Sequence, residues 1–221
     1  MIIKDIEQKI PYYYTKEISE DFLGIYSQKS HKLVSVVSSK YKLVQSRDLF
    51  KEILLQLKDY NFIKYTLKTN YKTHYLYLRM EFPGYTQKFM MILVNSVDKS
   101  NAVKFLVGVY EQLCANDLII TSWIYFKHIG QTEEKSKALK IFPGSIIMQY
   151  KALENKPNFL DERILQRLKG IIYLDEKITK EILALPNIYE VYNYVTSKMT
   201  KKYNMTYFQK LQSLYNILIR R

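Results

Sequence analysis

At 221 residues, with 48% hydrophobic side chains and only 6 Gly and 5 Pro, the chain can bury a core in one domain and leaves little material for disordered linkers. The formal net charge of +13 favours polyanionic partners, and the one cysteine excludes an intramolecular disulfide and favours a reducing, cytoplasmic location. Residues 1–9 carry four charges, and no stretch approaches the about 20 apolar residues of a membrane span, so we expect neither a secretory signal nor a membrane partner.

The first part of the chain predicts short strands followed by a helix. Residues 1–32 are treated as a separate N-terminal segment. Residues 33–37 and 41–44 are short and rich in β-branched side chains, which is typical of two strands around a turn. Ser46 is the expected N-cap of a helix that runs to about Lys58, because apolar residues recur there at helical spacing.

From Asn61 onward apolar and polar residues alternate, which indicates strands with one buried and one solvated face. We expect three such strands, over 61–68, 74–82 and 87–95, and they form an antiparallel meander. The apolar rows are Ile63, Tyr65 and Leu67 in the first strand and Leu76, Leu78, Met80 and Phe82 in the second.

The rest of the chain predicts a central helix, a further strand region and a helical end. An apolar stripe over residues 100–115, with Ser100 as a cap, predicts a helix that packs under the sheet. Residues 118–126 are apolar and β-prone. The helices expected after Gln131 span about 131–141, 144–155, 159–169, 175–184, 188–202 and 205–219, with Asn158 or Asp161, Asp175 and Asn187 as caps.

Together these elements predict an α+β fold: an antiparallel β-meander packed on a central helix, with a helical C-terminal third. The expected divisions are an N-terminal segment (1–32), an α+β core domain (33–130) and a helical region (131–221) packed on the core. Residues 135–221 hold 16 basic and 7 acidic side chains. This excess indicates either a nucleic-acid face or ordinary solvated helix faces in a chain with biased codon usage.

Several local patterns carry a resemblance to a known family. They are Val-Ser-Ser-Lys-Tyr-Lys-Leu-Val at 37–44, Asn-Ser-Val-Asp-Lys-Ser-Asn-Ala at 95–102, Cys-Ala-Asn-Asp-Leu at 114–118, Lys-His-Ile-Gly at 127–130 and Asn-Ile-Tyr-Glu-Val-Tyr-Asn-Tyr-Val-Thr at 187–196. In these patterns the chain resembles the phage/plasmid-like protein family built on domain of unknown function 932. It departs from the family where glycine is common, at Lys99 and Asp117, and where threonine is common, at Ile129.

The resemblance implies carriage on phages, plasmids or other mobile elements, and it defines no activity. A second likeness concerns mechanism. A β-meander followed by a packing helix that begins with a Ser-x-Ala sequence is similar to the core of the strand-annealing recombinases related to the eukaryotic recombination mediator. This likeness rests on the order of the elements, and fold alone does not establish function.

The solvated face of the predicted meander combines cations with aromatic rings. Cations neutralise phosphates and rings stack on unpaired bases, which is the chemistry that single-stranded DNA requires. The alternative is a solvated sheet face on which cross-strand aromatic pairs stabilise the sheet. The candidate residues on this face are Lys64, Lys68, Tyr75, Tyr77, Arg79 and Lys88.

Two further pairs of residues are candidates for nucleic-acid contacts. Asn95 and Ser96 lie where a strand is expected to pass into a helix, so they either cap that helix or contact a phosphate at its N-terminus. Lys127 and His128 follow an apolar strand. A lone histidine in such a place is either structural or a contact to a phosphate or a base.

The sequence predicts binding rather than catalysis. It has no phosphate-binding glycine loop, and zinc-type spacing is missing among the candidate ligands His31, His74, His128 and Cys114, so we expect no cofactor, metal site or catalytic residue. The predicted function is binding of single-stranded DNA in recombination or replication of a mobile element, with strand annealing as one use and a homo-oligomer as one form. The alternatives are a non-catalytic protein that binds a host factor, or a metal-dependent nuclease that uses acidic residues such as Asp98, Glu111 and Asp117.

Overall fold

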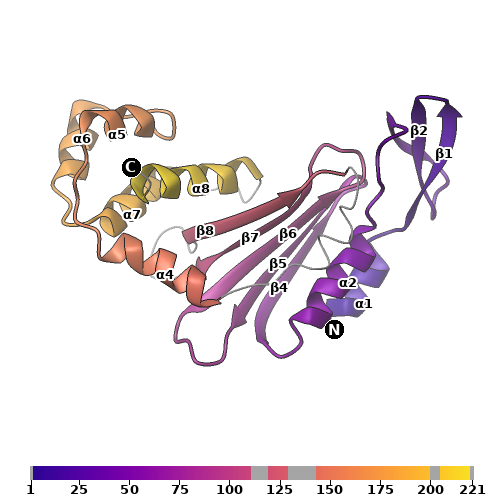
Figure 1. Ribbon diagram of the computed structural model, residues 1–221, viewed down its shortest axis with the longest axis horizontal. Coiled ribbons are helices and arrows are strands. Elements are labelled where there is room, and N and C mark those ends of the chain that lie inside the picture. The colour runs from indigo at the N-terminus through magenta and orange to yellow at the C-terminus, as the bar shows by residue number, and fades with distance from the viewer. Residues whose placement is uncertain (1, 111–118, 129–142, 200–204, 220–221) are drawn as a thin grey trace. The chain divides into compact units, whose positions relative to one another are not determined.

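The computed structural model describes residues 2–110, 119–128, 143–199 and 205–219 (Figure 1). Two β-sheets and seven α-helices in these residues confirm the predicted α+β class. The domain boundaries expected at residues 33 and 131 stay a prediction. The chain divides into two compact units, the first of Met1–Thr86, Met90–Leu106 and Ile124–Ile141, and the second of Gln87–Phe89, Val107–Trp123 and Phe142–Arg221.

The first unit begins with helix α1 (Ile2–Lys9) and a small antiparallel sheet. The sheet has the order β1-β2-β3, with β1 at Tyr13–Ser19, β2 at Phe22–Ser27 and β3 at Leu33–Ser38. Strand β3 confirms the first strand predicted after residue 32. The inward face of this sheet forms a hydrophobic core with two residues from elsewhere in the unit, and the core consists of Tyr13, Ile25, Val37, Tyr41 and Val97.

The strand predicted at 41–44 is wrong, because this run bonds to separate parts of the first unit instead of to one neighbouring strand. The Lys42 amide donates to the His128 carbonyl at 3.0 Å, and the Val44 carbonyl accepts a bond from Asn95 Nδ2 at 2.8 Å. The segment is therefore extended and β-branched without being part of a sheet. Its composition alone does not distinguish these two states.

Helix α2 (Ser46–Gln56) confirms the predicted helix, although its cap is wrong. The N-cap residue is Gln45, and the Ser46 side chain is buried within the first turn. An ion pair of 2.8 Å between Lys51 Nζ and Glu7 Oε1 joins α2 to α1. The two helices lie side by side next to β4 and β5 of the larger sheet (Figure 1).

The larger sheet is a five-stranded meander in which each strand neighbours the next one in sequence, in the order β4-β5-β6-β7-β8. The first three strands confirm the predicted meander, and the last confirms the strand predicted near 118–126. Their bounds are Asn61–Thr69 for β4, Thr73–Glu81 for β5, Lys88–Ser96 for β6, Val103–Tyr110 for β7 and Ile119–Phe126 for β8.

Strand β7 occupies the segment for which the sequence predicted a central helix, so that prediction is wrong. All residues of β7 except Lys104 are buried, which means that the strand is covered on both faces. Such a strand is a continuous apolar run, whose spacing fits a buried helix equally well. The β-branched residues Val103, Val107 and Val109 were the signal that favoured a strand. Residues 111–118 lie outside the described part of the chain.

The C-terminal part is helical, as predicted. Five of the expected helices are confirmed, and the one expected at 131–141 lies outside the described residues. Among those that are described, no helix is both long and apolar enough to cross a membrane. The helices are α4 (Pro143–Glu154), α5 (Glu162–Leu168), α6 (Glu176–Leu183), α7 (Ile188–Lys198) and α8 (Met205–Ile219).

Three of these helices begin at the caps that the sequence predicts. The side chains of Asp161, Asp175 and Asn187 accept hydrogen bonds from backbone amides three residues later, at 2.8, 2.7 and 2.8 Å. Asn158, the alternative cap of α5, instead donates through Nδ2 to the Leu185 carbonyl just after α6, at 2.7 Å. The caps thus fix where α5, α6 and α7 start, and Asn158 binds the chain that leaves α6.

Candidate nucleic-acid interface

Strands β4 and β5 bring five of the predicted contact residues onto one face of the sheet. In the register of the pair, Lys64 lies opposite Arg79, Thr66 opposite Tyr77, and Lys68 opposite Tyr75. Residues directly opposite each other in an antiparallel pair project from the same face. We call this set of six residues, Lys64, Thr66, Lys68, Tyr75, Tyr77 and Arg79, the β4–β5 polar face.

The reverse face of the same pair is covered, which confirms the predicted orientation of β5. The predicted row of Leu76, Leu78, Met80 and Phe82 is buried. Tyr65, which lies opposite Leu78, donates a hydrogen bond from its hydroxyl to Asp5 Oδ2 of α1 at 3.1 Å. Helix α1 therefore contacts the reverse face and leaves the β4–β5 polar face on the other side of the sheet.

The alternation predicted for β4 fails at its start. The register shifts between Phe62 and Lys64, so two residues of β4 lie where regular pairing has one. Phe62 lies opposite the buried Met80, and Ile63, predicted to belong to the apolar row, is 44% exposed. The bulge depends on the pairing with β5, which alternation within β4 does not reveal.

Tyr77 is not solvated, and this part of the prediction is wrong. Only 8% of the residue is exposed, and burial raises the pKa of its phenol. The Tyr75 ring stacks on it with 6.3 Å between centroids, and Lys68 Nζ lies 5.5 Å from the Tyr77 ring centroid. A stacking base would therefore meet the half-buried Tyr75 rather than the buried Tyr77.

The cations of the β4–β5 polar face differ in exposure. Lys64 and Lys68 are exposed on β4, which is an end strand in the order of the sheet. Arg79 is half-buried on β5. Lys88, the sixth predicted residue, is exposed at the start of β6 but belongs to the second unit. Lys68 thus lies opposite the half-buried Tyr75, and Lys64 lies further along the same strand, opposite Arg79.

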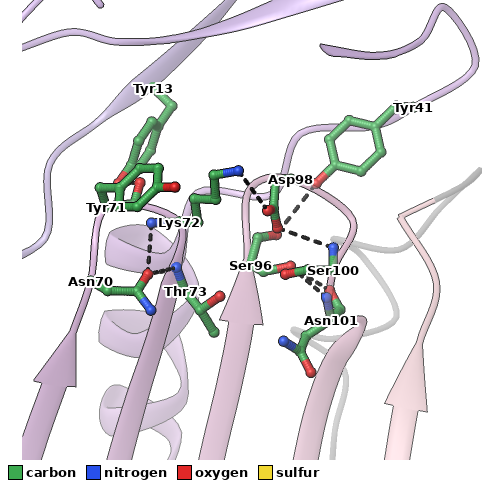
Figure 2. A network of polar contacts seen from close by, with 10 residues as sticks. All are labelled: Tyr13, Tyr41, Asn70, Tyr71, Lys72, Thr73, Ser96, Asp98, Ser100 and Asn101. Atoms are coloured by element: carbon green, nitrogen blue, oxygen red, sulfur yellow. Dashed lines mark hydrogen bonds and ion pairs between the residues drawn. The ribbon is translucent and has the colours of Figure 1, made fainter. Parts of the chain in front are cut away.

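Asn95 and Ser96 are not at a helix N-terminus, which corrects their predicted setting. Both are buried at the end of β6. Asn95 Nδ2 donates to the Val44 carbonyl and, at 2.9 Å, to Ser46 Oγ. Ser96 Oγ donates to the Asn101 carbonyl and accepts from the Asn101 amide, each at 2.8 Å (Figure 2). The Ser96 side chain holds the turn between β6 and β7, and the Asn95 side chain holds the segment that leads into α2. Neither side chain reaches the surface.

Asp98 and Lys72 join two neighbouring turns at this end of the sheet (Figure 2). Lys72 Nζ lies 3.5 Å from Asp98 Oδ2, and Asp98 Oδ1 accepts a bond from the Ser100 amide at 3.0 Å. Partial burial raises the pKa of Asp98, but the bonds from Ser100 and the charge of Lys72 outweigh it and hold that pKa below its usual value. Asp98, named in the nuclease alternative, is thus an ionised residue engaged in shaping a turn.

Lys127 and His128 lie after β8 and differ in accessibility. Lys127 is exposed, whereas His128 is buried. The His128 ring stacks on Tyr41 with 5.0 Å between centroids, and its Nδ1 lies 3.2 Å from the Lys42 carbonyl. Burial lowers the pKa of His128. The position favours the structural interpretation of this histidine over a contact to a ligand.

Among the described residues, no three histidine, cysteine or acidic side chains are grouped so that they could hold a metal ion. Glu111, Asp117 and Cys114 lie outside that part of the chain. The nuclease alternative therefore has Asp98 alone in the described structure, and Asp98 already has an amide and an ammonium as partners.

The sequence interpretation missed an exposed apolar face on the sheet β1-β2-β3. Five large side chains there are each 37–51% exposed: Tyr14, Ile18, Phe22, Leu33 and Val36. The signal was the alternation within 13–19 and 22–27, in a segment for which no elements were predicted. In β2 both faces are apolar, which weakens the alternation, and in β1 the charged Lys16 interrupts the outer row of Tyr14 and Ile18.

Comparisons of the chain with family models, with curated proteins and with solved structures find no match. The resemblance of the local patterns to the phage/plasmid-like proteins therefore stays a prediction, and the geometry of the first unit carries the functional argument.

Proposed function

We propose that the chain binds single-stranded DNA through the β4–β5 polar face, in the recombination or replication of a mobile element. The observation that carries the proposal is the register of the two strands, which puts Lys68 opposite Tyr75 and Lys64 opposite Arg79 on one face of the sheet. The mobile-element setting rests on the resemblance of local sequence patterns to the phage/plasmid-like proteins.

The charges on this face suit a phosphate backbone. Lys64 and Lys68 lie four residues apart on one strand, so their ammonium groups contact different phosphates of one nucleic-acid strand. Glu81 projects from the same side of β5 as Arg79 and is the one acidic residue of β4 and β5, and its Oε2 accepts a bond from Asn61 Nδ2 at 2.9 Å. The net charge of +13 adds a long-range attraction that raises the association rate and falls with salt.

The aromatic part of the face favours unpaired bases over a duplex. Tyr75 is half-buried and stacked on Tyr77, so its ring is fixed before a base arrives and loses little freedom on binding. A base that stacks on such a ring must be outside a double helix. Lys68, which lies opposite Tyr75, is placed to hold the phosphate of the same nucleotide.

The test measures binding of a fluorescent single-stranded oligonucleotide by anisotropy, at several salt concentrations from about 50 mM upward. The variant Lys64→Gln/Lys68→Gln should weaken binding and reduce the slope of log K against log[salt] by about 1.4, because each lost phosphate contact on a single strand removes about 0.7. The matched control is Lys169→Gln/Lys177→Gln, which removes two exposed charges from the second unit.

If the control variant loses as much affinity and slope as the Lys64/Lys68 variant, binding follows net charge and the β4–β5 polar face is not the site. Wild-type protein that shows no binding at about 50 mM salt contradicts the proposed function as a whole. Tyr75→Ala should weaken binding to single strands and leave binding to a duplex of the same sequence unchanged.

A further inference from the structure

The exposed apolar residues of the small sheet all lie on one face. Val36 is paired with Gly24, and a Cβ atom on Gly24 would lie within 3.1 Å of side-chain atoms of Tyr26, Ile18 and Leu33. These side chains therefore cross over the glycine on its own face, which is why the position has no side chain. Phe22 projects to the same side by alternation, and the Tyr14 ring stacks on Tyr26 at 5.5 Å. We call this surface the outer face of β1–β3.

The other face of the sheet is occupied by the core of the first unit. Tyr13, Ile25 and Val37 pack there with Tyr41 and Val97, and the Tyr13 hydroxyl donates to the Tyr71 carbonyl at 3.1 Å. The strands β2 and β3 are thus apolar on both faces and covered on the inner one, whereas the inner row of β1 continues beyond Tyr13 with the exposed Thr15 and Glu17. A sheet that exposes a contiguous apolar face is typical of a surface that packs against another protein layer.

The turns at the two ends of the outer face carry opposite charges, and one exposed cation, Lys40, follows β3 at the acidic end, where the Ser39 amide donates to the Asp21 carbonyl. The turn between β1 and β2 contains Glu20 and Asp21, and the turn between β2 and β3 contains Lys29 and Lys32. All four are exposed, and none has an ion-pair partner among the described residues. Because consecutive hairpin turns lie at opposite ends of a sheet, the acidic and basic pairs are separated by the length of the strands.

We propose that the outer face of β1–β3 is a two-fold interface with a second copy of this chain. A two-fold axis between the sheets, perpendicular to the strands, lays the two outer faces against each other with their strands antiparallel. Glu20 and Asp21 of each copy then meet Lys29 and Lys32 of the other. The apolar side chains pack between the two sheets, which is the arrangement of a β-sandwich core.

A second copy fits this face better than nucleic acid does. Ile18, Leu33 and Val36 are aliphatic, so they offer no ring for a base and gain most from burial against other apolar side chains. Glu20 and Asp21 would repel phosphates at one end. The only charged residue projecting from the face itself is Lys16, and it lies on β1, an end strand, where its long stem can carry the ammonium group out to solvent.

The area of the outer face of β1–β3 sets the expected affinity of dimerisation. Three strands of six or seven residues cover roughly 14 Å by 20 Å, which is less than the about 800 Å² per partner of a standard stable interface. We therefore expect a monomer–dimer equilibrium in the micromolar range or weaker, with dimer visible only at high protein concentration.

The test is sedimentation analysis over protein concentrations up to about 0.5 mM. Wild-type protein should pass from monomer to dimer, and Phe22→Lys should stay monomeric over the same range. The matched control is Leu55→Lys, which puts the same charge on an exposed apolar residue of α2. Circular dichroism shows whether the variants remain folded, which we expect because Phe22 and Leu55 are both about half exposed.

Charge reversal distinguishes a second copy from another partner. Glu20→Lys/Asp21→Lys makes both ends of the face basic, and Lys29→Glu/Lys32→Glu makes both acidic, so each variant alone should dimerise less than wild type. Their mixture should form a heterodimer. The proposal would be overturned if the wild type stayed monomeric, if Phe22→Lys still dimerised, or if the mixture of the two charge-reversal variants formed no heterodimer. Loss of DNA binding by Phe22→Lys in a monomeric wild type would assign the face to nucleic acid instead.

Discussion

At the scale of single residues, a buried polar contact joins the small sheet to the larger one, between Tyr13 of β1 and His74 of β5. His74 is fully buried, and its Nε2 lies 3.3 Å from the Tyr13 hydroxyl. Its Nδ1 finds no hydrogen-bond partner in the described structure. Burial lowers the pKa of His74 to about 4. Because a buried His74 must be neutral to remain in this position, acid should destabilise the contact between the two sheets.

We predict that stability falls as pH drops from about 6.5 to 4. The unfolded chain binds a proton at His74 near the ordinary pKa of 6.5, while the folded chain resists it until about 4, so the stabilisation is complete above 6.5. The loss amounts to about 3 kcal/mol for a shift of this size. Urea unfolding of wild type and His74→Gln at several pH values measures the difference.

The control for this prediction is His31→Gln, because His31 is exposed. It should keep the pH dependence of the wild type, whereas His74→Gln should lose most of it and retain only the part that His128 and the carboxylates contribute. Equal pH dependence in wild type and His74→Gln would contradict the assignment of a buried neutral His74.

At the scale of elements, the sequence predicts what is local and misses what depends on a partner. Asp161, Asp175 and Asn187 were predictable as caps because each bonds to an amide three residues later in the same helix. The apolar row of β5 was predictable from alternation. The bulge after Phe62 depends on the pairing with β5, and the burial of Tyr77 depends on tertiary packing. Alternation within one strand reveals neither the pairing nor the packing.

The candidate site shows the same division. The shared face of Lys64, Lys68, Tyr75 and Arg79 follows from two alternating strands joined by a short turn, and the register confirms that these residues share a face. The setting of Asn95 and Ser96 was wrong because it assumed a helix after β6. Because the following segment is a strand, Ser96 bonds within the β6–β7 turn, and Asn95 bonds to Val44 and Ser46 at the start of α2.

Substitutions in β5 test how its two faces are covered. Leu78→Ala should cost about 2–5 kcal/mol as a truncation in the core. Tyr77→Ala should cost an amount of the same order, because only 8% of the residue is exposed and its ring contacts Tyr75 and Lys68. Thr66→Ala, an exposed position opposite Tyr77, is the control and should stay within about 0.5 kcal/mol. Chemical denaturation measures all three.

If Tyr77→Ala lowered the free energy of unfolding only slightly while Leu78→Ala lowered it strongly, Tyr77 would be a solvated member of the β4–β5 polar face. In that case Tyr77 would join Tyr75 as a stacking ring. The stability measurement therefore also decides how many bases this face can accept.

At the scale of the whole molecule, the two proposals have a joint consequence. The β4–β5 polar face and the outer face of β1–β3 consist of different residues, so one copy can bind DNA and pair with a second copy at once. A dimer then carries two DNA-binding faces. A strand long enough to reach both converts the second contact into an intramolecular one, which raises affinity without any new interaction.

We therefore predict that affinity rises with oligonucleotide length more steeply in wild type than in Phe22→Lys. A strand of about 10 nucleotides occupies one face, since single sites span about 4–16 nucleotides, and a strand of about 40 nucleotides can reach two. Phe22→Lys should bind the short strand normally and lose the extra affinity for the long one. Leu55→Lys adds the same charge on α2 and should behave as wild type. A length dependence that is equal in all three proteins would mean that pairing through β1–β3 does not contribute to DNA binding.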